Sequence, residues 1–168
     1  MEKGGALSLS FGMIFSILMI VAILGIAFFA INHFLNLQKC TTTTLFHQDF
    51  QNKIKSAWNA EIVSEEFSLS LPSRIKLVCF GNLEEPGTLT GETKEAYEEL
   101  MKYSTLKQQE ESNLFLHPQE KSCDMGYVGA KHIDLSELGR FTCFETRDGK
   151  IKLEIEKGSE DALVKIIG

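Results

Sequence analysis

Charge is absent from a long stretch near the start of this 168-residue chain. No Asp, Glu, Lys or Arg occurs between Gly4 and Asn32, and the segment Phe11–Leu37 is almost entirely apolar. A helix rises about 1.5 Å per residue and the hydrocarbon core of a bilayer is about 30 Å thick, so about 20 apolar residues can cross it. Because lipid offers the backbone no hydrogen-bond partners, the sequence predicts a transmembrane helix.

Two other kinds of segment are weighed against an anchor. A cleaved secretory signal has an apolar core of only about 7–15 residues followed by small residues, whereas this run is longer and ends in His33, Phe34 and Leu35. A buried helix of a soluble protein rarely stays uncharged over such a length. We therefore expect residues 1–39 to form the N-terminus and a single membrane span, with the lipid bilayer as partner.

Catalytic and metal-binding motifs are missing from the rest of the chain. It has no G-x-S-x-G, no H-E-x-x-H and no Gly-rich phosphate loop. No C-x-x-C occurs, and no histidine stands at a finger-like spacing from a cysteine. We predict that the protein is not an enzyme and holds no metal or cofactor. A thiol enzyme using Cys123 and His132 is the catalytic alternative.

Basic residues are outnumbered beyond Lys39. Residues 40–168 carry 15 basic and 22 acidic residues, a net charge of −7. Binding to a phosphate backbone needs clustered Lys and Arg. We therefore expect one acidic domain over residues 40–168 and no nucleic-acid partner.

The cysteines all lie in this acidic domain, at Cys40, Cys79, Cys123 and Cys143. An even count predicts two disulfides and an oxidising compartment, and four buried free thiols are the alternative. Three pairings are open. We favour Cys123 with Cys143, because these residues bracket one short segment, which leaves Cys40 with Cys79. With Lys3 in the short N-terminal flank, the cysteines favour a cytoplasmic N-terminus and an extracytoplasmic domain.

The pattern after the membrane segment indicates an α+β domain. Four threonines at 41–44 disfavour a helix interior and are expected to loosen the helix. Phe46, Phe50, Ile54 and Trp58 then recur every four residues, which predicts an amphipathic helix packed on a sheet. Binding of this apolar stripe to a partner helix is the alternative.

The remaining residues suggest a small mixed sheet of about five strands. Glu66–Leu71 alternates in polarity, and Arg74–Phe80 is apolar on both faces and is expected to be central. A helix at Glu92–Leu106 and a strand at Leu114–Leu116 follow, an order that predicts a parallel crossover.

A C-terminal hairpin is the clearest local signal in the domain. Phe141–Glu145 and Ile151–Glu156 flank Asp148-Gly149, a dipeptide that suits a type I′ turn. Ala162–Ile167 is apolar enough to pack as a final strand or a short helix.

Small residues mark one face of the membrane helix. Ser8, Gly12 and Ser16 stand four residues apart, a spacing that lets a second helix approach closely. We expect self-association through this face.

The N-terminus, Lys3 to Phe11 (KGGALSLSF), resembles the leader of archaeal type IV pilin-like proteins. The resemblance implies an anchor that becomes a filament core after a peptidase removes the leader, followed by an amphipathic helix and a sheet. Two positions depart from the pilin pattern: Ala6 replaces the expected glutamine, and Ser10 replaces the expected glutamate. An uncleaved anchor is therefore the alternative.

The whole chain also resembles archaeal single-span membrane proteins of unknown function. The similar segments are Gln38–Cys40, Gln48–Ile62, Leu71–Leu83 and Lys150–Gly158. This second resemblance implies the same architecture and no particular activity. We expect an extracytoplasmic protein that acts through contacts with other membrane or surface proteins, as a pilin-like or accessory subunit. A membrane-tethered sensor or ligand-binding domain is the alternative, and it predicts a concave pocket lined by the sheet.

Overall fold

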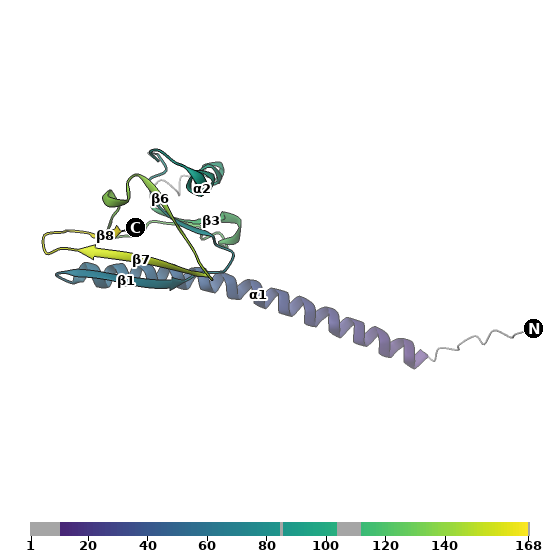
Figure 1. Cartoon of the computed structure of the whole chain (residues 1–168). Helices are drawn as coiled ribbons and strands as arrows, with labels where there is room; N and C mark the ends of the chain where they lie inside the picture. Colours follow the sequence, from purple (N-terminus) through teal and green to yellow (C-terminus); the bar gives the residue numbers. More distant parts are fainter. Residues whose placement is uncertain (1–10, 85, 104–111, 168) are drawn as a thin grey trace, which may run out of the picture. The chain divides into compact units, whose positions relative to one another are not determined.

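The computed structural model of the chain describes residues 11–84, 86–103 and 112–167 (Figure 1). The chain divides into two compact units, residues 1–38 and 39–168. Helix α1 (Phe11–Asn59) contributes residues to both units. Ser8, Ala6 and Ser10 lie outside the described residues.

The part of α1 that belongs to the first unit exposes its apolar side chains. Every large apolar side chain from Met13 to Leu37 is at least 44% exposed, and Phe29 is 73% exposed. Among the residues that the structure describes, α1 is the one helix long and apolar enough to cross a membrane. These side chains therefore find no core within their own unit.

The threonines at 41–44 do not interrupt α1, so the expected loosening of the helix is wrong. Thr43 is fully buried. The Thr44 hydroxyl donates a hydrogen bond to the Cys40 carbonyl oxygen one turn earlier, at 3.1 Å. Burial and this local bond outweigh the weak intrinsic preference of β-branched residues against helix.

The second unit contains two four-stranded sheets, and the α+β prediction is confirmed. The first, which we name the β1 sheet, has the order β1 (Val63–Ser70), β7 (Lys150–Lys157), β8 (Val164–Ile167), β5 (Ile133–Asp134). The second, the β2 sheet, has the order β4 (Tyr127–Val128), β3 (Leu114–His117), β2 (Leu77–Gly81), β6 (Phe141–Glu145). Helix α2 (Gly91–Tyr103) and the short 3-10 turns η2 (Gln119–Lys121) and η3 (Ser136–Leu138) complete the described elements.

The main core joins α1 to the inner faces of both sheets. Phe46, Phe50 and Ile54 are at most 1% exposed and contact apolar side chains of both sheets, as the stripe predicted. Trp58 is instead 37% exposed, and Ala57 is the buried residue of the last turn. The stripe therefore leaves the core at its C-terminal end.

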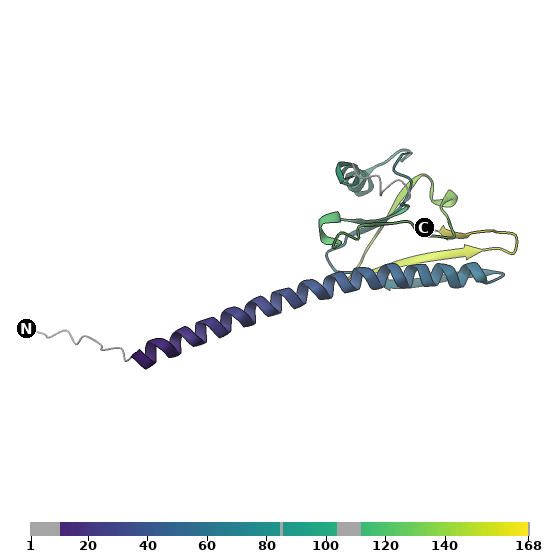
Figure 2. The ribbon, with the colours of Figure 1, turned by 180° about the vertical axis from the view of Figure 1, so that it is seen from behind.

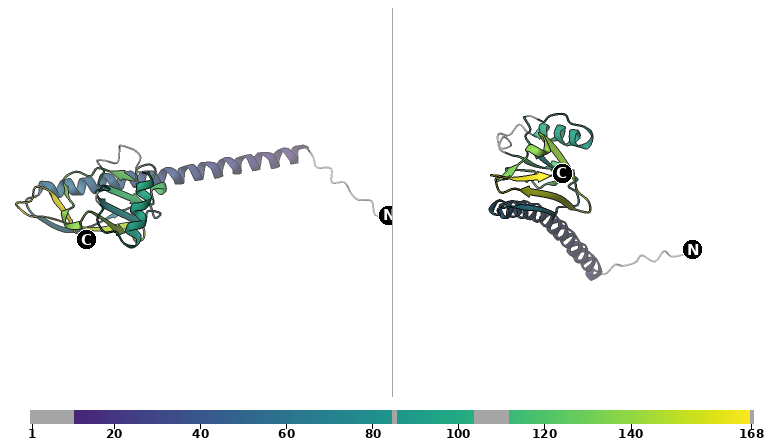
Figure 3. Two further views of the ribbon diagram at one scale, coloured as in Figure 1. Left: turned by 90° about the horizontal axis from the view of Figure 1, so that it is seen from above. Right: turned by 60° about the vertical axis from the view of Figure 1, so that its left-hand side comes forward.

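A second, smaller core lies on the other face of the β2 sheet. There Ala96 and Leu100 of α2 pack on Leu77, Cys79 and Phe115. Figures 1 and 2 and the right-hand view of Figure 3 place α2 on the opposite side of this unit from β1. The prediction that the strand ending at Phe80 is central and apolar on both faces is confirmed, because β2 lies between β3 and β6.

The predicted parallel crossover from β2 through α2 to β3 is wrong. The two strands are antiparallel, with Phe80 opposite Leu114 and Leu77 opposite His117. The connection that contains α2 thus leaves and re-enters the sheet at the same end, as a long hairpin loop does. A strand–helix–strand order requires parallel pairing only when the helix carries the chain back along the sheet.

The predicted turn at Asp148-Gly149 is present, with φ of 52° and 68° at its two residues. Arg147 and Lys150 exchange backbone hydrogen bonds across it. The two strands then diverge, since β6 pairs with β2 whereas β7 pairs with β1 and β8. This divergence gives eight strands in two sheets among the described residues, where the sequence suggested about five in one.

Candidate functional site

Two disulfides link the four cysteines, but in a pairing other than the one we favoured. Cys79 bonds to Cys143, its directly opposite residue on the neighbouring strand, and Cys40 bonds to Cys123. Pairing Cys123 with Cys143 is therefore wrong. Nearness in sequence misled the prediction, because β6 lies across β2 from β3 and away from the loop that carries Cys123.

The loop after η2 is fastened to α1 by the Cys40–Cys123 disulfide and by two contacts that Met125 makes. The Thr44 hydroxyl lies 3.3 Å from the Met125 sulfur, and His47 Nε2 lies 2.9 Å from the Met125 carbonyl oxygen. A neutral His47 with its proton on Nε2 donates this second bond. These contacts hold the loop between η2 and β4 against α1.

Burial lowers the pKa of His47, and the hydrogen bond to Met125 opposes this shift only in part. Its Nδ1 atom is buried and has no hydrogen-bond partner within the described part of the chain. A proton on Nδ1 would place an unpaired charge in the protein interior, at a high free-energy cost. Burial and the unpartnered Nδ1 atom therefore both favour the neutral form of His47.

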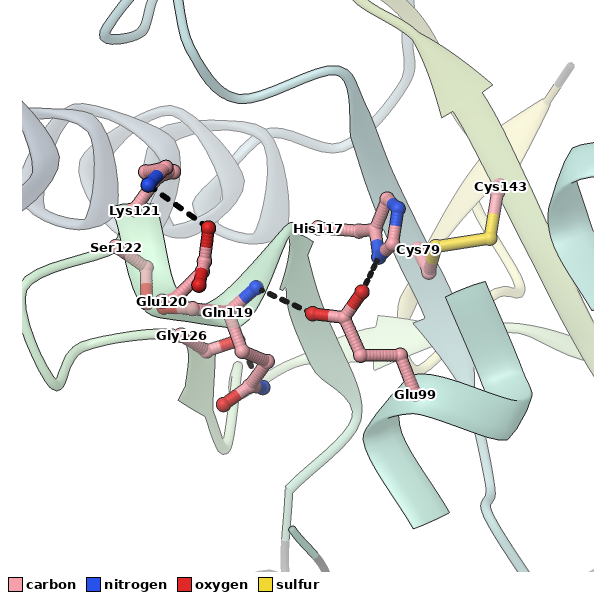
Figure 4. A network of polar contacts seen from close by, with 9 residues as sticks. All are labelled: Cys79, Glu99, His117, Gln119, Glu120, Lys121, Ser122, Gly126 and Cys143. Atoms are coloured by element: carbon pink, nitrogen blue, oxygen red, sulfur yellow. Dashed lines mark hydrogen bonds and ion pairs between the residues drawn. A yellow bond between two sulfur atoms is a disulfide. The ribbon is translucent and has the colours of Figure 1, made fainter. Parts of the chain in front are cut away.

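Glu99 of α2 anchors a polar network at the end of β3 (Figure 4). One carboxylate oxygen accepts a hydrogen bond from the Gln119 backbone N–H at 3.0 Å. The other lies 3.2 Å from His117 Nδ1, within ion-pair distance but not aligned as a hydrogen bond. Gln119 Nε2 in turn donates to the Gly126 carbonyl oxygen at 3.2 Å. The network joins α2 to the loop that the Cys40–Cys123 disulfide fastens.

The residues of the thiol-enzyme alternative are not brought together. Cys123 is held in its disulfide, and His132 stacks on Trp58 with ring centroids 3.9 Å apart. Within the described ranges, no group of three or more His, Cys, Asp or Glu side chains is placed to hold a metal ion.

The small-residue face of the first unit is described only in part. The Ser16 hydroxyl donates to the Gly12 carbonyl oxygen of its own helix at 2.8 Å. The hydroxyl is thus satisfied inside the helix and adds little bulk to the face. Close packing of a second helix here stays a prediction.

Two open grooves flank the β1 sheet. One, which we name the β1 groove, has a volume of about 410 Å³ and is lined by α1 and β1 residues: Asp49, Asn52, Lys53, Ser56, Phe67, Ser68 and Leu69. The other, of about 940 Å³, opens where β6 and β7 diverge, and is lined by Ser68, Cys143, Phe144, Glu145, Arg147, Asp148, Lys150 and Lys152. Sequence patterns did not reveal either groove, because both depend on which strands become neighbours.

Three exposed apolar residues lie at the end of α1, in the segment just after it, and in the β7–β8 loop that is joined to it. We name Trp58, Ile62 and Leu163 the Trp58 patch; they are 37%, 68% and 40% exposed. Trp58 Nε1 donates to the Ala162 carbonyl oxygen at 3.0 Å, which joins the end of α1 to the β7–β8 loop. The stripe that contains Trp58 was expected to pack in the core, so its exposed end is a surface feature that the sequence did not mark.

Searches of protein-family models, curated proteins and solved structures find no match to this chain.

Proposed function

We propose that this chain is a single-pass membrane protein whose extracytoplasmic domain, residues 40–168, acts by binding other proteins. It would serve as a pilin-like subunit or as an accessory subunit of a surface complex, without enzymatic activity of its own. The observation that carries the proposal is the exposure of every large apolar side chain from Met13 to Leu37. Such a surface is stable only in lipid or against other apolar helices.

The two disulfides support the proposed side of the membrane. Disulfides persist in oxidising compartments and are rare where thiols are kept reduced. Both bridges lie in residues 40–168, at Cys40–Cys123 and Cys79–Cys143. An extracytoplasmic location for this unit is consistent with their presence.

The Trp58 patch supports a role in protein contacts. Tryptophan is enriched among the residues that contribute most to protein interfaces. Glu61 and Glu160 lie close to the patch in sequence and are exposed. A partner with an apolar centre and a basic rim would match this surface.

Fractionation of cells that express the full chain tests the anchor. We expect the protein in the membrane pellet after alkaline carbonate extraction and its release only by detergent. Recovery in the soluble fraction would contradict the proposal. The intact mass, measured before reduction, separates the two versions: loss of the first few residues supports a processed pilin-like subunit, and the full mass supports an uncleaved accessory subunit.

A ligand-binding or sensor domain is the second candidate, and the larger groove favours it. Arg147, Lys150 and Lys152 line this groove of about 940 Å³ together with Glu145 and Asp148. Arg147 lies within ion-pair distance of Glu145, and Lys152 of Glu66. Lys150 is then the cation that a small anionic ligand would meet in this groove. A panel of small carboxylates and phosphates should raise the unfolding temperature if this function is correct, and Lys150→Ala should remove the effect.

A further inference from the structure

The outer edge of β1 has backbone groups that no other strand satisfies. β1 is the terminal strand of its sheet and pairs only with β7 over residues 63–70. Leu71 and Gly149 lie opposite each other just beyond this register. The Leu71 N–H donates to the Gly149 carbonyl oxygen at 2.8 Å, so the two form a hydrogen-bonded pair. Because bonded pairs alternate in antiparallel sheets, Val63, Glu65, Phe67 and Leu69 direct their backbone groups toward β7.

It follows that the N–H and C=O groups of Ser64, Glu66, Ser68 and Ser70 point away from the sheet. Among the described residues, no backbone hydrogen bond reaches any of the four. Proteins usually protect such an edge with proline, a bulge or inward-pointing charge. Glu65 points inward and pairs with Lys53 at 2.8 Å, but residues 67–70 carry no charge and no proline.

The β1 groove runs along this same stretch of edge. Phe67 and Leu69, both half-buried, form its apolar floor, and Asp49 and Asn52 of α1 are exposed on its opposite wall. Asp49 has no ion-pair partner within the described ranges, whereas Lys53 is engaged with Glu65 and lies 5.7 Å from the Phe67 ring centroid. The groove thus offers an apolar strip beside one uncompensated negative charge.

We propose that β1 is a strand-acceptor site for an extended segment of a partner protein. The segment would form a fifth strand of the β1 sheet. Its backbone would hydrogen-bond to the outward N–H and C=O groups of Ser68 and of the other even-numbered residues from 64 to 70. Its apolar side chains at every second position would contact Phe67 and Leu69, and a Lys or Arg would approach Asp49. Strand addition of this kind takes affinity from the backbone and specificity from alternate side chains. The proposal adds the β1 edge to the Trp58 patch as a second surface for the protein contacts proposed above, and it rests on that role.

A peptide selection on the full chain in lipid nanodiscs tests the proposal. The probe is a displayed library of random peptides about twelve residues long, enough for one strand. We expect the selected peptides to share alternating apolar residues and at least one basic residue. They should slow hydrogen exchange at the amides of residues 64–70, where no strand protects the even-numbered positions.

A matched pair of variants at Ser68 identifies the binding mode. Ser68→Pro removes an N–H that the β7 ladder does not use, and Ser68→Val keeps that N–H and favours strand. We expect Ser68→Pro to weaken peptide binding about tenfold and Ser68→Val to leave it within about twofold. Asp49→Asn should weaken the binding of peptides that carry a basic residue severalfold and leave the binding of neutral peptides unchanged.

N-methylation along a selected peptide provides a second readout if Ser68→Pro does not fold. Methyl groups on alternate amides should abolish binding, and methyl groups on the intervening amides should not. The proposal is overturned if no peptide is recovered, if Ser68→Pro binds as wild type does, or if N-methylation has no alternating effect. Dimerisation of the full chain that Ser68→Pro abolishes would also overturn it, because the occupant would then be a second copy. None of these results depends on membrane fractionation. An experiment that contradicts the membrane anchor can therefore be told apart from one that contradicts strand addition at β1.

Discussion

At the scale of single residues, the contacts of Glu99 distinguish it from its neighbours on α2. Glu98 is also acidic, but its side chain is 59% exposed. Its ion pair with Lys94, at 3.8 Å, lies on the surface. The Glu99 side chain is 26% exposed and accepts the Gln119 N–H. The two adjacent glutamates therefore form a matched comparison between a part-buried acceptor and a solvated one.

We expect Glu99→Ala to lower the free energy of unfolding by about 1–2 kcal/mol, because the part-buried Gln119 N–H loses its acceptor. Glu98→Ala should change it by less than about 0.5 kcal/mol. Thermal unfolding of the detergent-solubilised chain, followed by circular dichroism, measures both. Equal losses in the two variants would show that the Glu99 network does not stabilise the fold.

His47 predicts a pH dependence of stability with a defined sign. Burial lowers its pKa in the folded state below the ordinary value of 6.5, so the unfolded chain binds more protons in that range. The contribution of neutral His47 is therefore present above about pH 6.5 and is lost as the pH falls toward the lowered value. His47→Gln keeps an N–H donor for Met125 and cannot be protonated. Its unfolding temperature should fall less than that of wild type between about pH 7.5 and about pH 5.5, and an equal fall would contradict this assignment.

Which of these residues the sequence could identify depends on what surrounds each one. The cysteines were recognised from their number and position, but not their partners, because pairing is set by strand order. His47, His117 and Glu99 carried no signal, since an isolated histidine or a glutamate in an acidic helix is ordinary. His47 and Glu99 bond to backbone atoms of Met125 and Gln119, which no side-chain pattern encodes. His117 lies beside Glu99 only because the fold brings the end of β3 to α2.

At the scale of elements, α1 shows how far periodicity can predict packing. The spacing of Phe46, Phe50 and Ile54 identified the buried face correctly, because one helical face repeats every three to four residues. Periodicity alone could not show where the sheets end. It therefore placed Trp58 in the buried face, although Trp58 lies at the edge of the core and is partly exposed. Sequence predicted the Asp148-Gly149 turn as well, but a turn fixes only its own residues and not the sheet that each strand joins.

Among the α1 positions tested, Phe50 is where truncation to Ala is expected to destabilise the fold most. It is 1% exposed and contacts Phe46 and Phe80 with ring centroids 6.2 and 5.6 Å apart. Phe50→Ala should lower the free energy of unfolding by about 3–5 kcal/mol, through lost burial and the cavity that remains. Leu45→Ala is the control, since Leu45 is 49% exposed and its loss should cost less than about 0.5 kcal/mol. Similar effects at both positions would mean that α1 does not pack as described.

At the scale of the whole molecule, the disulfides tie distant parts of the second unit together. Their cysteines are 83 and 64 residues apart in sequence. Chain-entropy arguments assign each bridge about 4 kcal/mol of stabilisation, because both close long loops in the unfolded state. The double variants Cys40→Ala/Cys123→Ala and Cys79→Ala/Cys143→Ala should each lower the unfolding temperature markedly. Peptide mapping without reduction should recover the same two linkages, and a Cys123–Cys143 peptide would refute the pairing.

The anchor is the feature that the sequence predicts most directly, because composition and length alone decide whether a helix can cross a bilayer. The side of the membrane on which residues 40–168 lie depends instead on few charges, with Lys3 and Lys39 at opposite ends of the apolar run. Orientation is therefore the claim on which the proposed role in extracytoplasmic protein contacts depends.

Protease protection in intact cells measures that orientation. Cells expressing the full chain with a C-terminal epitope tag are treated with protease before and after lysis, and a cytoplasmic protein serves as control. The account predicts that the tag is lost from intact cells while the cytoplasmic control survives. A tag that is protected until the cells are lysed would place residues 40–168 inside the cell and contradict the account.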